Sequence, residues 1–223
     1  MKVSYIHHSG FLVETEAHYY LFDYEAGELP EMDAEKPILV LSSHSHRDHY
    51  NPEVFALLRD RGMAHIRGIL SDDIQAPADI DILQVSGRQE YAIGPRQSLH
   101  TLRSTDLGVA FLLEDQGKLI YHAGDLNDWV WEEESDSYNE EMTAAYRKEL
   151  RLLRQVTGQR EIDLAFVVLD PRQGKDFHRG LRYFLENIPV KQVYPMHYWD
   201  DPSVIHRFIQ GHPEYQGKIQ ATE

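Results

Sequence analysis

The sequence predicts an α/β protein of four layers, an αββα sandwich in which two β-sheets pack face to face and helices cover their outer faces. Three observations predict this fold class. Strand patterns dominate the start of the chain and recur in a second β-rich stretch between residues 80 and 121. Helical patterns follow each stretch, and the final third alternates strand, helix, strand and helix. Since no linker or low-complexity segment divides the chain, we expect residues 1–223 to form a single domain.

The first β-rich stretch opens with three short segments of β-formers that we expect to form a meander: Val3 to Ile6, Phe11 to Glu14 and His18 to Phe22. Ile38 to Leu41 is an unbroken apolar run, typical of a strand buried on both faces. Asn51 can cap a helix and Pro52 can occupy its first position, before the apolar side chains that start at Val54. The residues between Leu41 and Asn51 therefore form a strand-to-helix loop.

The second half begins with four expected strands, at residues 80–85, 89–93, 108–113 and 118–121. A helix is expected from near Asn139 to Gly158, because apolar residues recur there at helical spacing. The last elements are a strand at 164–169, a helix at 180–186, a strand at 190–194 and a helix from Pro202.

Composition limits the chemistry that the chain can perform. Hydrophobic residues make up 42% and charged residues 26%, which is typical of a folded globular protein. The sequence contains no cysteine, which removes disulfides, thiolate nucleophiles and thiolate metal ligands together. Any bound metal must therefore use histidine and carboxylate ligands.

Charge and hydropathy point to a cytoplasmic protein that acts on small molecules. The formal net charge of −15, from 37 acidic and 22 basic side chains, repels nucleic-acid phosphates, so we expect no nucleic-acid partner. The longest apolar run, Leu164 to Leu169, is far shorter than the roughly 20 residues that span a membrane. The opening residues do not have the pattern of a secretory signal. The sequence leaves open whether the chain forms a homo-oligomer.

The main chemical signal is a run of six residues directly after the expected buried strand: His44-Ser45-His46-Arg47-Asp48-His49. On a tight loop, His44 and His46 can point one way while Asp48 and His49 point another, so that one segment serves two adjacent ions. Imidazole with carboxylate suits zinc, manganese or iron. The alternative is a polar surface loop that is rich in histidine by chance.

This run resembles the H-x-H-x-D-H motif of the metallo-β-lactamase superfamily at every defined position. Two later segments extend the resemblance in the family's order, since Asp125 looks like the metal-bridging carboxylate and His197 like the last metal-binding histidine. The resemblance implies a metallo-β-lactamase fold with two divalent metal ions. Within the superfamily, Ile6 to Phe11 and Tyr194 to His197 look closest to the compact branch that contains L-ascorbate-6-phosphate lactonase.

One family position does not match. Relatives usually have a metal-binding histidine just before the strand that corresponds to residues 108–113, where this chain has Ser104-Thr105-Asp106-Leu107. Asp106 is close to the required spacing and is an acceptable ligand for the first metal. His100 has the expected chemistry but lies further upstream. We expect Asp106 to be the ligand and keep His100 as the alternative.

The reaction expected from such ligands is hydrolysis. Two metal ions would lower the pKa of a shared water from about 15.7 toward 7 and so provide a bridging hydroxide as the nucleophile. For proton transfer we expect His8, Asp170 and His178, and we also count the ligand Asp48 among the catalytic residues. His8 can instead be a buried structural imidazole, and Asp170 can instead form a loop salt bridge.

Three tryptophans, Trp129, Trp131 and Trp199, follow Asp125 and His197. They can form an apolar wall over the metals or pack the loops. Taken together, the sequence predicts a metal-dependent hydrolase of a small ester, lactone or phosphoester. The alternatives are a non-catalytic metal-binding protein of the same fold and, with less support, a nuclease or phosphodiesterase.

Overall fold

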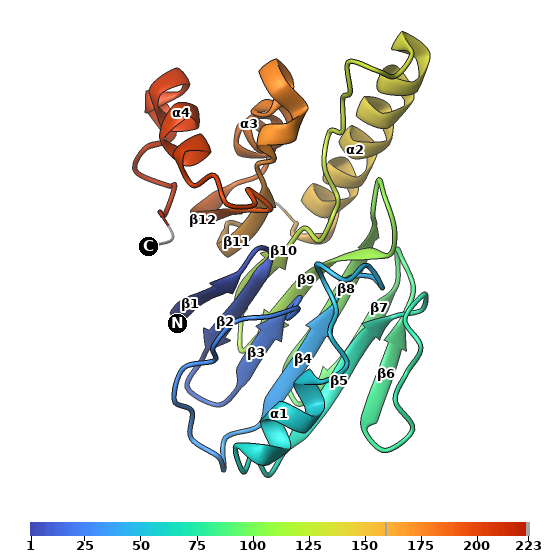
Figure 1. The fold of residues 1–223 in the computed structure, drawn as a ribbon, viewed down its shortest axis with the longest axis vertical. Helices are drawn as coiled ribbons and strands as arrows, with labels where there is room; N and C mark the ends of the chain where they lie inside the picture. Colours follow the sequence, from blue (N-terminus) through green and yellow to red (C-terminus); the bar gives the residue numbers. More distant parts are fainter. Residues whose placement is uncertain (159, 222–223) are drawn as a thin grey trace. The chain divides into compact units, whose positions relative to one another are not determined.

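The computed structural model describes residues 1–158 and 160–221. These residues belong to two compact units, Met1–Ser86 and Gly87–Glu223. Each unit contains one six-stranded mixed sheet; the first unit adds helix α1, and the second adds α2, α3 and α4 (Figure 1). The single domain expected over residues 1–223 stays a prediction, and its residues 159, 222 and 223 lie outside the described part of the chain.

The sheet of the first unit runs in chain order from β1 to β6. Strands β1, β2 and β3 are antiparallel, and β3 to β6 are parallel. Helix α1 (Val54–Asp60) connects β4 to β5 and contributes Val54, Phe55 and Leu58 to the hydrophobic core. The six strands are β1 (Lys2–His7), β2 (Gly10–Glu14), β3 (Tyr19–Phe22), β4 (Ile38–Ser42), β5 (Ile66–Ser71) and β6 (Asp81–Val85).

The parallel pair β3 and β4 determines where the polar residues of this unit gather. All five residues of β4 are buried, as its apolar run predicts. The carboxyl ends of parallel strands meet at one edge of a sheet, so Asp23, which follows β3, lies beside Ser43 and His44, which follow β4. The backbone N–H of Asp23 donates to the carbonyl of Leu41 at 2.8 Å, which fixes this edge.

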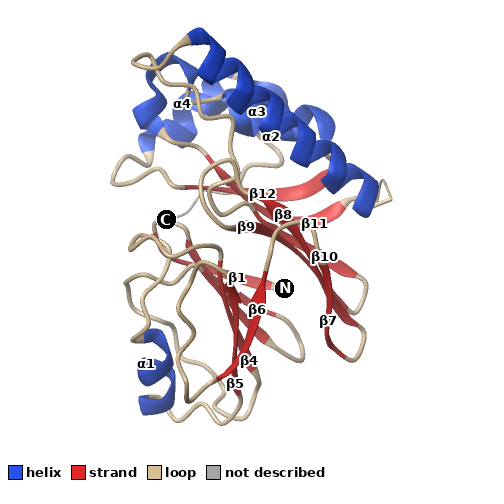
Figure 2. Ribbon diagram, turned by 90° about the vertical axis from the view of Figure 1, so that its right-hand side faces the viewer, coloured by secondary structure: helices blue, strands red, loops and turns tan. Residues whose placement is uncertain are grey.

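The sheet of the second unit has the order β12-β11-β10-β9-β8-β7. Strands β7 to β10 form an antiparallel meander, and β10, β11 and β12 are parallel. Its helices, α2 (Asp136–Val156), α3 (Arg179–Asn187) and α4 (Ser203–Gly211), lie together on one face of this sheet (Figure 2). The strands are β7 (Glu90–Gly94), β8 (Gln97–Arg103), β9 (Val109–Asp115), β10 (Lys118–His122), β11 (Ile162–Val168) and β12 (Val190–Met196).

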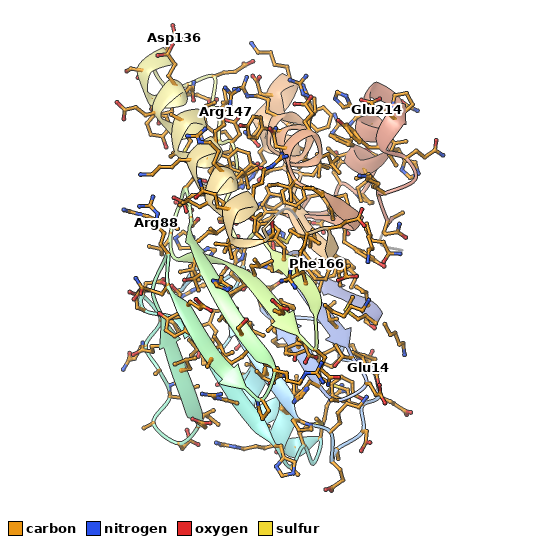
Figure 3. All side chains as sticks on the ribbon, turned by 180° about the vertical axis from the view of Figure 1, so that it is seen from behind. Glu14, Arg88, Asp136, Arg147, Phe166 and Glu214 are labelled. Atoms are coloured by element: carbon orange, nitrogen blue, oxygen red, sulfur yellow. The ribbon has the colours of Figure 1, made fainter. Side chains whose placement is uncertain are left out.

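Hydrogen bonds to a buried carboxylate connect α2 to this sheet. Glu149 is 3% exposed and accepts hydrogen bonds from Nε of Arg88 at 3.0 Å and from the backbone N–H of Arg103 at 3.1 Å (Arg88 is labelled in Figure 3). The helix starts at Asp136, three residues earlier than expected, because Ser135 caps it by accepting from the N–H of Tyr138. The acidic run before Asn139 concealed that start.

Two strands, β5 and β8, have no counterpart among the expected elements. In β5 the pattern is interrupted by Gly68, where a Cβ would lie 2.3 Å from Cδ1 of Ile82 on the neighbouring strand, so a larger residue would require the Ile82 side chain to move. In β8 the alternating buried positions include the polar Gln97 and Thr101, which conceal the period of two. Among the described helices, none combines the length and the apolar character needed to cross a bilayer. The cytoplasmic location stays a prediction.

Candidate metal-binding clusters

In the first unit, the turn between β1 and β2 and the loop after β4 bring together five side chains that can bind metal. We call them the N-terminal cluster: His8, His44, His46, Asp48 and His49. The ring centroid of His44 lies 4.7 Å from that of His46 and 4.1 Å from that of His49. Because His44 contacts both rings, the two predicted pairs adjoin one another instead of facing apart.

Asp23 lies behind this cluster and orients two of its imidazoles. Its Oδ2 accepts from Nδ1 of His49 at 2.7 Å and from the hydroxyl of Ser43 at 2.6 Å. The hydroxyl has thereby used its only hydrogen, so Nδ1 of His44, 2.9 Å away, donates to it. His44, His49 and Asp23 are fully buried. Both imidazoles therefore hold their proton on Nδ1 and carry the ring lone pair on Nε2.

Asp48 lies among the Nε2 atoms of the same cluster. Its Oδ2 is 3.6 Å from Nε2 of His8 and 3.9 Å from Nε2 of His49. These separations exceed the usual hydrogen-bond range of about 2.7–3.2 Å. Two ligands about 2.1 Å from one tetrahedral ion lie about 3.4 Å apart, so the spacing suits shared coordination better than direct bonding.

In the second unit, three side chains form what we call the C-terminal cluster: Asp106, Asp125 and His197. Nε2 of His197 is 3.3 Å from Oδ1 of Asp125. A carboxylate oxygen of Asp106 lies within 4.8 Å of one of Asp125. His197 directly follows β12, and Asp125 follows β10 after Gly124, which has a positive φ of 50° that favours glycine.

Hydrogen bonds join the loops that carry Asp106 and Asp125. The Thr105 hydroxyl donates to the carbonyl of Asn127 at 2.7 Å and accepts from its backbone N–H at 2.9 Å. His100 lies on β8, opposite Glu90 of β7, with its Nε2 3.6 Å from the Glu90 carboxylate. The structure thus brings Asp106, and not His100, beside Asp125.

Asp170 orients His197 in the same way as Asp23 orients His49. Its Oδ2 accepts from Nδ1 of His197 at 3.0 Å, and Arg172 donates to both carboxylate oxygens. Burial opposes ionisation of Asp170, but the hydrogen bonds from His197 and Arg172 outweigh it and lower the pKa to about 2. Asp170 is therefore an ionised acceptor at neutral pH.

The remaining catalytic candidates lie in different surroundings. His8 is 3% exposed and its ring centroid is 5.7 Å from that of His49, so it belongs to the N-terminal cluster. His178 precedes α3 and contacts the rings of Phe177 and His212. Burial and the nearby His212 lower its pKa. Among the described residues, the groups of side chains close enough to share an ion do not include His178.

The chemistry of these side chains fits a divalent metal. His44, His49 and His197 each donate from Nδ1 to an oxygen, which is the usual arrangement behind a metal-ligating imidazole. Carboxylates lie beside the Nε2 atoms in both clusters. A mixed nitrogen and oxygen donor set suits zinc, manganese or iron.

The sequence reasoning did not identify Asp23. The signal was present, because Asp23 ends an apolar strand just as Asp170 does. An isolated aspartate after a strand is common in turns, however, and the parallel pairing of β3 with β4 is what brings it under the histidine loop.

Comparison with known proteins identifies the family. The model of the beta-lactamase superfamily domain matches residues 2–139, more than half of the chain. This chain belongs to the beta-lactamase superfamily. The match includes the N-terminal cluster together with Asp106 and Asp125.

Full-length relatives agree with this assignment. A UPF0173 metal-dependent hydrolase of Bacillus velezensis is 24% identical over the whole of this chain and 97% of its own length. Igni18, a metallo hydrolase of Ignicoccus hospitalis, superposes with a TM-score of 0.69 at 16% identity, covering 99% of this chain and 94% of its own. A metal-dependent hydrolase of Parabacteroides distasonis gives 0.64 at 15% identity, with 98% and 90% covered.

These comparisons confirm the metallo-β-lactamase fold expected from the sequence. These relatives are themselves named metal-dependent or metallo hydrolases, the enzyme class expected from the sequence.

Proposed function

We propose that this superfamily member hydrolyses a small ester, lactone or phosphoester with two divalent metal ions. The observation that carries the proposal is the orientation of His44, His49 and His197, each of which holds Nδ1 against an oxygen acceptor and so makes Nε2 the nitrogen that can bind a metal. The proposed ligands are His44, His46, Asp48, His49, Asp106, Asp125 and His197.

The proposed ligands belong to the two clusters. Support comes from the H-x-H-x-D-H motif and from the family model, whose match to residues 2–139 includes ligands of both. Asp125 has two carboxylate oxygens and can bridge the ions. The mixture of imidazole and carboxylate favours zinc or manganese, with iron as the alternative.

When bound, the metals supply a nucleophilic water at neutral pH and polarise the scissile group. Asp23 and Asp170 hold the imidazole protons on Nδ1 and so keep the ligands in one tautomer. His8, whose Nε2 is 3.6 Å from Asp48, is our first candidate to carry a proton to the leaving group. Asp48 and His178 remain the other proposed catalytic residues, while Asp170, which is fully buried and pairs with Nδ1 of His197, acts as a positioning residue.

The substrate class follows from chain properties and from the resemblance to the ascorbate-6-phosphate lactonase branch. The segments Ile6 to Phe11 and Tyr194 to His197 carry that resemblance and favour a lactone or related ester. The net charge of −15 disfavours nucleic acid as the substrate or partner. We propose a cytoplasmic enzyme without a membrane partner, with a homo-oligomer left open.

The test is hydrolysis of ester, lactone and phosphodiester panels by native, chelated and metal-reconstituted protein. We expect turnover that chelation abolishes and metal restores. His46→Ala should remove activity, whereas His65→Ala, at an exposed histidine outside both clusters, should keep it. A native protein without metal and without activity on any panel would refute the proposal, and metal binding without turnover would favour the non-catalytic alternative.

A further inference from the structure

Arg172 shares the carboxylate that orients His197. It lies in the 3₁₀ turn after β11, and its Nε and Nη2 donate to Oδ2 of Asp170 at 2.9 and 2.5 Å. The same oxygen accepts from Nδ1 of His197 at 3.0 Å. The guanidinium is therefore held in a fixed position one carboxylate away from a proposed metal ligand.

The rings of two tryptophans lie close to the Arg172 guanidinium. Its central carbon lies 4.5 Å from the ring centroid of Trp199 and 5.9 Å from that of Trp131. Trp131 stacks on Trp129, with centroids 5.6 Å apart and planes inclined by 7°. These are the three tryptophans of the sequence. The cation–π contacts therefore restrain the plane of the Arg172 guanidinium, and the hydrogen bonds to Asp170 restrain its edge.

The backbone of the segment that carries Trp199 is strained. His197 and Trp199 have φ values of 63° and 53°, in the left-handed region that L side chains rarely adopt. Strain of this kind persists where the surrounding structure enforces it, often at functional sites. Trp199, one of the two indoles that lie over the Arg172 guanidinium, is part of this strained segment.

Neutralisation of the buried Asp170 explains only part of the arrangement. It accounts for Nε and Nη2 of Arg172, which face the carboxylate. The third nitrogen, Nη1, makes no hydrogen bond to any residue in the described part of the chain, and 49% of the side chain is exposed. An oriented donor with an open edge is suited to bind an oxygen anion.

We propose that Arg172 anchors a carboxylate or phosphate group of the substrate, which makes the substrate of the proposed hydrolase an anionic ester or lactone. This inference rests on the proposed function. The average field of a chain with charge −15 repels anions, so a local cation with directed donors, such as Arg172, favours binding of a substrate anion. Hydrogen bonds between charged groups contribute about 1.5–3 kcal/mol, which corresponds to roughly 10- to 150-fold in affinity.

The first test compares three esters with the same scissile bond and a carboxylate, a phosphate or a neutral amide at the far end. Arg172→Ala should lower kcat/KM for the preferred anionic ester about 10- to 100-fold more than for the neutral ester, and this extra loss should appear mainly in KM. The two anionic esters identify which anion is bound. Equal losses on all three esters at unchanged metal content would overturn the proposal.

Arg207→Ala is the matched control. Arg207 also pairs with a carboxylate, Asp201, and lies over an aromatic ring, Phe177, with 50% of its side chain exposed. It should behave as the native protein does. If Arg172→Ala does not fold, Arg172→Lys is the second variant. Lysine keeps the positive charge but lacks the planar pair of N–H donors, so this variant should lose most of the preference for the anionic ester.

A second readout does not depend on turnover. Because Trp131 and Trp199 lie over Arg172, tryptophan fluorescence should change saturably when the purified protein is titrated with inorganic phosphate or acetate. Arg172→Ala should weaken that response at least tenfold, and Arg207→Ala should not. Identical titrations of Arg172→Ala and native protein would overturn the inference even if hydrolysis is established. If no ester is hydrolysed, the proposed function fails and this titration still decides the role of Arg172.

Discussion

At the scale of single residues, the oxygen that accepts from Nδ1 determines what each imidazole can do. Asp23 holds His49 directly and His44 through the Ser43 hydroxyl, while Asp170 holds His197. A proton fixed on Nδ1 makes Nε2 the basic nitrogen, which a metal requires. These two aspartates therefore prepare the proposed ligands before any ion binds.

The first prediction concerns the third ligand of the first metal. Asp106→Ala should weaken metal binding at that site and lower activity by orders of magnitude, because the carboxylate lies within 4.8 Å of Asp125. His100→Ala should change little, since His100 faces Glu90 on β8. Metal titration and steady-state kinetics of both variants make the comparison, and the reverse order of effects would assign the site to His100.

A carboxylate at this position also has a consequence for metal preference. It adds negative charge and oxygen character relative to an all-imidazole site, which shifts preference from zinc toward manganese or iron. Asp106→His should shift it back toward zinc.

At the scale of elements, strand ends supply the polar residues. Asp23 and His44 follow the parallel strands β3 and β4, and Asp170 and His197 follow the parallel strands β11 and β12. Their grouping at sheet edges follows from parallel pairing.

The second prediction concerns Asp163, which joins β10, β11 and β12. Burial opposes its ionisation, but hydrogen bonds from Lys191 and from the backbone N–H of Leu119 outweigh it and lower the pKa of Asp163. Its contribution is therefore present above the unfolded-state pKa of about 3.9 and is lost as pH falls through the lower folded value.

Asp163→Asn tests this contribution. The variant should lose about 1 kcal/mol of unfolding free energy at pH 7, and the difference from the native protein should shrink below about pH 4. Urea unfolding of both proteins across this range gives the answer. A difference that grows toward low pH would contradict the assigned role.

Sequence patterns predicted most elements but not all of their bounds. The apolar run of β4 and the helical stripe of α2 were sufficient because burial on defined faces imposes a clear period. Strands β5 and β8 were not predicted, since Gly68 and the buried polar Gln97 and Thr101 break that period. The motif pointed to the histidines that are proposed as ligands, whereas Asp23 required knowledge of which strands are neighbours.

At the scale of the whole molecule, the proposed ligands come from loops far apart in sequence, from His44 to His197. An ion that binds only the folded chain shifts the folding equilibrium toward the state that assembles those loops. Metal binding and stability should therefore be coupled.

The third prediction follows from that coupling. Chelation should lower the melting temperature by on the order of 10 °C, because ligand at about 1,000 times its Kd adds about 4 kcal/mol and each kcal/mol shifts a chain of this size by about 2–4 °C. Calorimetry before and after verified metal removal measures the shift, with metal re-addition as the control. An unchanged melt would argue against the proposed ligand set.

The most direct test of the two-metal centre is elemental analysis of native protein, His49→Ala and the control His65→Ala. We predict about two ions per chain in the native protein and the control, and about one in His49→Ala, whose altered side chain belongs to the proposed second site. Loss of both ions from a folded His49→Ala protein would contradict two separable sites. A native protein that binds no metal when supplied with zinc, manganese or iron would contradict the metal centre itself.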